Sequence, residues 1–191
     1  MKTRIVASLT ILSVLAILLV NCKLIGFAGE TIFVEVTLDE EYHVQSNSSS
    51  YDGEQQINLA QTYADAGVTP QEIVGVELQL LEIIITENNT GDNTTANGSV
   101  YFRNSAAGSQ EYLLAGFVNQ NLNQVLNQPI TPFSIANELQ INPAGVQQLK
   151  TMLLSVPPPT LVFRMAGTAN NPPVNFKARV NIDLQVEKTT G

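Results

Sequence analysis

Near its C-terminal end the chain alternates strictly between apolar and polar residues, from Val174 to Val186. The apolar members are Val174, Phe176, Ala178, Val180, Ile182, Leu184 and Val186. Because successive side chains of a strand point to opposite faces, this alternation predicts a long strand with one buried face and one wet face. Strands of this kind are typical of antiparallel sheets that pack on one side only.

Seven further segments are predicted to be strands. They are Thr31–Asp39, Gln55–Ala60, Ile73–Glu87, Ser99–Arg103, Glu111–Val118, Phe133–Leu139 and Thr160–Thr168. Within Ile73–Glu87 the apolar phase changes by one residue, which predicts a β-bulge near Leu80 or Leu81. Together with the C-terminal segment, the patterns predict about eight strands.

Turn-forming residues separate these strands. Loops are predicted at Ser46–Gly53 and Asn88–Gly98, and Asn97-Gly98 is a strong hairpin signal. The segment Asn119–Gln128 is expected to be a loop with helical turns. Asn170–Pro173 is expected to turn the chain so that the last two strands form a hairpin.

One short helix is predicted, at about residues 143–155. Asn142 can cap it, Pro143 suits the first helical position, and an apolar stripe follows at Val146, Leu149, Met152 and Leu153. The helix must end before Pro157-Pro158-Pro159. We therefore expect an antiparallel β-sandwich with one helix over an open end, and a closed barrel is the alternative.

The N-terminal segment has the features of an export signal. A charge-free run from Ile5 to Cys22 follows Lys2 and Arg4, as in an export signal. The run ends in Leu19-Val20-Asn21-Cys22, which resembles the lipobox of bacterial lipoproteins, although Asn21 stands where that family usually has a small residue. The resemblance implies cleavage before Cys22, lipidation of its thiol with acyl chains such as palmitate, and anchoring in the cell envelope.

The resemblance implies that residues 1–21 are the signal peptide and 22–30 a tether, and the strand patterns predict that residues 31–191 form the β-sandwich domain. Lys23 follows the cysteine where an Asp often marks inner-membrane retention, so the resemblance points to the outer membrane. Two alternatives stay open. Cleavage after Gly26-Phe27-Ala28 would give a secreted protein, and an uncleaved segment would remain as an N-terminal anchor.

The composition limits both how the fold can be stabilised and which partners the chain can bind. Cys22 is the only cysteine, so the fold must rest on packing without disulfides. The net charge is -8, and loss of Lys2 and Arg4 with the signal would take it to -10. The nine basic residues are scattered along the chain, and we therefore expect no nucleic-acid partner, because polyanions are bound by clustered Lys and Arg.

No set of catalytic or cofactor-binding residues stands out. The only histidine is His43, which argues against a Ser-His-Asp triad and against zinc. Calcium is less easily dismissed because it takes carboxylate and amide oxygens, and its weak candidate ligands are Asp39, Glu41, Asp52 and Asp92. Neither an enzymatic activity nor a cofactor is predicted.

These observations favour a lipid-anchored envelope protein whose non-catalytic β-sandwich presents loops to a protein, a glycan or an assembly partner. One alternative is a carrier that holds a lipid or another apolar ligand between its sheets. A second alternative is a self-assembling subunit, a possible homo-oligomer, in which an edge strand such as Thr31–Asp39 pairs with another copy.

Overall fold

A computed structural model describes residues 30–134 and 138–190. The predicted signal peptide and Cys22 lie outside the described residues, so cleavage and lipidation stay predictions. None of the helices in the described part of the chain is long and apolar enough to cross a membrane.

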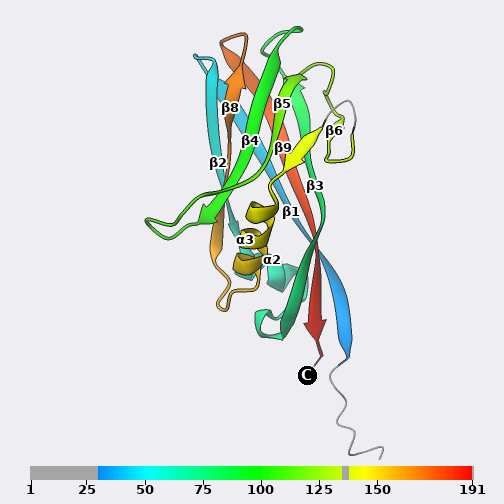
Figure 1. Cartoon of the computed structure of the whole chain (residues 1–191). Helices are drawn as coiled ribbons and strands as arrows, with labels where there is room; N and C mark the ends of the chain where they lie inside the picture. Colours follow the sequence, from blue (N-terminus) through cyan, green and yellow to red (C-terminus); the bar gives the residue numbers. More distant parts are fainter. Residues whose placement is uncertain (1–29, 135–137, 191) are drawn as a thin grey trace, which may run out of the picture.

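Two antiparallel sheets pack face to face (Figure 1), which confirms the predicted β-sandwich. The first sheet has the order β1 (Thr31–Ser46), β9 (Val174–Thr189), β3 (Ile73–Asn88) and β6 (Pro129–Ile130). The second has the order β2 (Ser50–Asn58), β8 (Thr160–Ala169), β4 (Thr95–Asn104), β5 (Tyr112–Asn121) and β7 (Leu139–Ile141). Outside the sheets lie α2 (Leu59–Asp65), the 3-10 turn η1 (Pro70–Glu72) and α3 (Pro143–Leu153).

The strands pair in a nested order. β1 pairs with β9, β2 with β8, β3 with β6, and β4 with β5. This is the arrangement of a jelly roll, in which one long antiparallel ribbon is rolled into two sheets. The predicted hairpin between the last two strands is therefore wrong, because β8 belongs to the second sheet and β9 to the first. The turn at Asn170–Pro173 reverses the chain, but β9 finds its partners in β1 and β3.

The first strand and the region after it also differ from prediction. β1 continues past Asp39 to Ser46, so the predicted loop shrinks to the residues between β1 and β2. β2 ends at Asn58, whose Oδ1 accepts hydrogen bonds from the backbone N–H groups of Ala60 and Gln61, at 3.1 and 3.3 Å. The cap starts α2, a helix that the alternation of Ile57 and Leu59 did not reveal.

Two further local predictions are wrong. Asn97-Gly98 lies inside β4 instead of forming a hairpin turn, since the loop before β4 ends at Thr94. The predicted strand Phe133–Leu139 is not formed at its start: β6 ends at Ile130, β7 begins at Leu139, and Phe133 is 88% exposed in a turn. Residues 135–137 lie outside the described part.

Three predictions are confirmed. The register of β3 against β9 shifts between Leu78 and Leu80, where the phase change predicted a bulge. The helix α3 begins at Pro143 behind Asn142, whose Oδ1 accepts from the N–H groups of Ala144 and Gly145 at 3.0 and 3.3 Å. The alternating C-terminal segment forms β9 in the middle of the first sheet.

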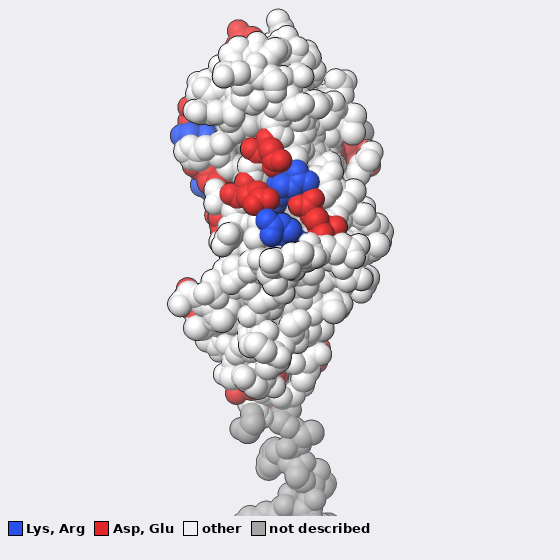
Figure 2. Space-filling model, turned by 90° about the vertical axis from the view of Figure 1, so that its left-hand side faces the viewer, with Lys and Arg blue, Asp and Glu red and all other residues white. Residues whose placement is uncertain are grey.

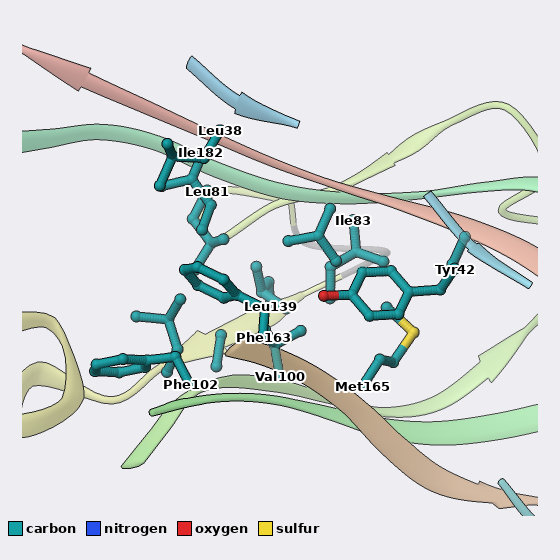
Figure 3. Packing of buried hydrophobic residues seen from close by; sticks show 14 of the residues in the cluster. Leu38, Tyr42, Leu81, Ile83, Val100, Phe102, Leu139, Phe163, Met165 and Ile182 are labelled. Carbon is teal, nitrogen blue, oxygen red and sulfur yellow. The ribbon is translucent and has the colours of Figure 1, made fainter. Parts of the chain in front are cut away.

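Large side chains from both sheets fill the space between them (Figure 3). Tyr42 of β1 points at this core together with Phe102, Phe163 and Met165 of the second sheet, and all four are at most 1% exposed. The Tyr42 hydroxyl has no hydrogen-bond partner among the described residues, and burial raises the pKa of Tyr42. The core is thus packed by apolar groups and also encloses the Tyr42 hydroxyl.

Candidate functional site: a groove across the second sheet

An open groove of about 660 Å³ lies on the outer face of the second sheet, bordered on one side by the start of α3. Its lining comes from β4, β5, β7 and β8 and from Asn142 and Pro143. The strand register explains why the sheet is hollow here, because it brings small residues together from separate parts of the chain.

The floor of the groove is one row of residues that runs across the strands. Ala166 of β8 lies opposite Ser99 of β4, and Ser99 lies opposite Gly116 of β5. The row continues to Asp52 on β2 at one end and to Gln140 on β7 at the other. With strands about 4.8 Å apart, the distance from Ala166 to Gly116 is roughly 10 Å, and over this length no side chain is larger than that of Ser99.

Larger side chains wall this floor on both sides. One wall is the cross-strand row Arg164, Tyr101 and Leu113. The other wall is formed by the paired residues Thr168 and Asn97 together with Val118, which is 62% exposed. On β4 and β8 each wall lies two residues from the floor along the strand, which is about 7 Å. The result is a narrow trough whose long axis crosses the strands.

On the inner face of the sheet, behind the wall that contains Thr168 and Asn97, aromatic rings are packed. Gly98 and Gly167 lie opposite each other, with Tyr51 beside Gly167 and Phe117 beside Gly98. A Cβ on Gly98 would lie 2.4 Å from the Phe117 ring, and one on Gly167 would lie 2.0 Å from the backbone oxygen of Asn97. The Tyr51 side chain extends across the two glycines, and its hydroxyl donates to the backbone oxygen of Asn97 at 2.8 Å. The rings therefore replace the missing side chains and hold β2, β8, β4 and β5 together.

Charged side chains gather next to the groove, and Figure 2 shows them in the middle of this face with uncharged residues immediately above. Arg164 donates to Glu111 through Nε at 2.8 Å and through a terminal nitrogen at 2.6 Å, and to Asp52 at 3.1 Å. Its guanidinium carbon lies 4.7 Å from the centre of the Tyr101 ring. Arg103 pairs with Glu54 at 3.2 Å.

Of the described residues that line the groove, Arg164 alone is charged, and these contacts neutralise it. Its hydrogen bonds to Glu111, first among several causes, raise the pKa of Arg164, so it stays protonated. The groove thus offers a ligand hydroxyl, amide and apolar groups and no free charge.

The Arg164–Glu111 pair predicts a measurable pH dependence of stability. The hydrogen bonds from Arg164 lower the pKa of Glu111 below its ordinary value of 4.5. A lowered pKa means that the pair stabilises the fold above pH 4.5 and that this contribution is lost as the pH falls through the lowered pKa. We expect Glu111→Gln to destabilise the protein at pH 6, by less than about 1 kcal/mol because the pair is partly exposed, and to have a smaller effect near pH 3.

Urea unfolding of wild type and variant at the two pH values measures this difference. Arg164→Lys is the companion variant: it keeps the charge but loses the two-pronged geometry, so it should lose most of the same pH dependence. An equal effect of Glu111→Gln at both pH values would contradict the assigned pair.

The predicted calcium ligands do not come together. Asp39 and Glu41 lie on the first sheet, paired with Arg179 at 3.5 Å and with His43 at 2.7 Å. Asp52 lies on the second sheet and is held by Arg164, while Asp92 accepts from the Asn123 amide at 2.8 Å in the loop before β4. In residues 30–134 and 138–190, no three or more His, Cys, Asp or Glu residues gather around one point.

The groove residues were not predicted from the sequence. Ser99, Gly116 and Ala166 are small residues in three separate strands, and nothing in their local sequence marks them. Their only shared signal is that each is a small residue in a strand, and knowing the register is necessary to see that they are neighbours.

No family model matches the chain, and no curated protein matches it either. Among solved structures, a chain of turnip yellow mosaic virus is similar at a TM-score of 0.35 and 10% identity, over 84% of this chain and 96% of that chain. A chain of mud crab tombus-like virus gives 0.30 and 10%, over 84% and 83%. The decameric BFDV capsid protein gives 0.29 and 8%, over 82% and 99%. These values are too low to bear on function.

Proposed function

We propose that this chain is a lipid-anchored binding protein of the bacterial cell envelope and that the groove across the second sheet binds its ligand. The observation that carries the binding role is the row Ala166, Ser99 and Gly116, a floor of small residues between two walls whose one charged member, Arg164, is paired with Glu111 and Asp52. Concave sites with apolar walls and a few polar groups are where ligands generally bind. The anchor is inferred from the lipobox-like Leu19–Cys22 alone.

The ligand class that fits the groove best is a short neutral saccharide. Peptides bind β proteins mostly by adding a strand to a free edge, where backbone groups are unpaired. The floor lies in the middle of a sheet, where the backbone groups are already paired, so hydrogen bonds must come from side chains such as Ser99, Thr168 and Gln140. Hydroxyl and amide side chains both donate and accept, which suits a hydroxyl-rich ligand without charge.

A binding role requires no catalytic group. Among the described residues, the groove lining contains neither a histidine nor a carboxylate, and its one arginine is held by Glu111 and Asp52. The alternative role as a carrier gains no support from the packing, since Tyr42, Phe102 and Phe163 occupy the space between the sheets.

A panel of neutral oligosaccharides, with uncharged peptides as a second arm, tests the groove. Wild type is expected to bind members of the saccharide arm, and Ser99→Tyr and Ala166→Tyr, which fill the floor from the solvent side, are expected to lose at least tenfold in affinity. Gln56→Tyr is the matched control, since Gln56 is exposed on the same face of β2 outside the groove. Binding that survives both filling variants, or binding of the peptide arm alone, would refute the saccharide site.

The anchor is tested separately. In a bacterial host grown with labelled palmitate, the wild-type chain should take up label and gain the mass of its acyl groups, and Cys22→Ser should do neither. An unlabelled chain that begins at Gly29 would instead show ordinary secretion, and a chain that keeps Met1 would show an uncleaved anchor.

A further inference from the structure

β1 is an edge strand with an open side. Among the described residues it forms a ladder with β9 alone, in unbroken register from Thr31 to Ser46. In Figure 1 the first residues of β1, drawn in blue, run along the outer edge of the strands that extend past α2, with β9 on their other side. The segment Thr31–Glu35 therefore has one paired and one unpaired side.

Two hydrogen bonds show which backbone groups face the open side. The backbone N–H of Thr190 donates to the oxygen of Glu30 at 3.0 Å, so even-numbered residues of β1 point to β9. The oxygen of Glu41 faces the other way, because it accepts from the Gln55 side chain at 2.7 Å. Since residues of a strand alternate and the register is unbroken, Thr31, Phe33 and Glu35 direct both their N–H and their C=O to the open side.

The edge at Thr31–Glu35 lacks the features that usually prevent an edge strand from pairing with another chain. Natural edge strands carry Lys, Pro or a bulge, whereas Thr31–Glu35 has β-branched and aromatic residues and a single charge, that of Glu35. Phe33 is 62% exposed on the outer face, opposite Glu187 of β9. An unpaired edge with an exposed aromatic residue and one charge is therefore open to pairing with another strand.

We propose that this edge is a homodimer interface in which β1 pairs with β1 of a second copy, antiparallel and centred on Phe33. In this register Phe33 lies opposite Phe33 of the partner subunit, Thr31 opposite the partner's Glu35, and Ile32 opposite the partner's Val34. The edge groups of Thr31, Phe33 and Glu35 then donate to and accept from the same three residues of the other copy. The pairing is isologous, as expected for a two-fold dimer.

The charges favour a second copy in this register. If the antiparallel pairing were centred on Glu35, the Glu35 carboxylates of the two copies would lie directly opposite each other, which is destabilising. A centre at Phe33 puts each Glu35 against a threonine and buries the two exposed rings on each other, and aromatic cross-strand pairs are favourable. The sequence from Thr31 to Glu35 is thus complementary to itself when it is reversed.

Disulfide cross-linking in the full chain tests the register, with Cys22→Ser to remove the natural thiol. Phe33→Cys should form a disulfide-linked dimer rapidly, because directly opposite residues lie about 5.5 Å apart at the Cα atoms. Glu35→Cys alone should not, but a mixture of Thr31→Cys and Glu35→Cys chains should cross-link. Val118→Cys measures random collision, since Val118 is also 62% exposed but lies on β5.

Sedimentation of the same chains in density-matched detergent tests the interface itself. Wild type should be dimeric, Phe33→Lys monomeric, and Val118→Lys dimeric. Glu35→Pro removes an N–H that faces the open side and leaves the ladder to β9 intact, so it should give a folded monomer, whereas Glu35→Gln should stay dimeric. A wild type that is monomeric at the highest attainable concentration, or cross-linking of Glu35→Cys as fast as Phe33→Cys, would overturn the proposal.

Discussion

Replacing Gly145 by alanine is expected to destabilise the protein by at least about 2 kcal/mol, although helix propensity predicts the opposite sign. Gly145 lies in the first turn of α3, where alanine is normally favoured by about 1 kcal/mol. Here a Cβ would lie 1.9 Å from the backbone oxygen of Leu113 and 2.9 Å from its carbonyl carbon. The neighbouring Asn142 N–H fixes this approach by donating to the oxygen of Leu114 at 2.9 Å.

Urea unfolding measures the effect, and Gly53→Ala is its control. A Cβ on Gly53, within β2, would meet only Tyr42 Cδ1, at 3.6 Å, which is an ordinary contact. That variant should be neutral or stabilising by about 0.5 kcal/mol, because glycine is unfavourable inside a strand. If Gly145→Ala were as stable as wild type, α3 could not lie against the backbone of β5 as the structure has it. The start of α3 borders the groove, so the same variant should also weaken ligand binding.

The same substitution, tyrosine to phenylalanine, is expected to have opposite effects at two buried sites. The Tyr63 hydroxyl donates to the backbone oxygen of Leu153 at 2.8 Å, near the end of α3. Tyr63→Phe leaves that buried acceptor unpartnered and should cost about 1–3 kcal/mol. Tyr42→Phe removes a buried hydroxyl that has no partner among the described residues, and should stabilise the fold by about 1 kcal/mol.

Each tyrosine variant is the control for the other, because both side chains are at most 1% exposed and lose the same atom. Their free energies of unfolding, extrapolated from urea titrations, should differ by more than about 2 kcal/mol. A destabilised Tyr42→Phe would show that a buried water satisfies the hydroxyl. An unchanged Tyr63→Phe would show that the bond to Leu153 adds nothing, and that α2 and α3 are held together by apolar contact alone.

The groove and the β1 edge lie on different sheets, so binding and dimerisation can be separated by mutation. Ser99 and Ala166 lie on the outer face of the second sheet, and Phe33 lies on the edge strand of the first. A groove-filling variant should remain dimeric, and Phe33→Lys should still bind the saccharide. Each proposal can therefore fail without the other.

Local sequence is informative about which face of a strand is buried and where a helix begins. The period of two in Val174–Val186 and the phase change near Leu80 report which face of a strand is buried, and both predictions are confirmed. The Asn142-Pro143 start of α3 is equally local, because the cap is satisfied by backbone groups within three residues. The prediction of which strands pair is wrong at the turn before β9, because β9 pairs with β1 and does not form a hairpin with β8.

The site could not have been found in the same way. Asn97-Gly98 is a turn signal by composition, yet Gly98 lies in a strand because Phe117 and Tyr51 occupy the place of its side chain. The acidic residues proposed as calcium ligands do not gather, because Asp39 and Asp52 pair with arginines on neighbouring strands and Asp92 accepts a hydrogen bond in the loop before β4. Small residues such as Ser99 and Ala166 acquire significance only when the register puts them side by side.

By itself, the sequence determined the β-sandwich class, the long wet-faced strand β9 and the capped helix α3, since these depend on periodicity and on contacts within a few residues. The tertiary structure decided the nested jelly-roll pairing, the floor of the groove and the open edge at Phe33. These features depend on which strands become neighbours, and that choice is made by the packing of whole sheets, which no local pattern records.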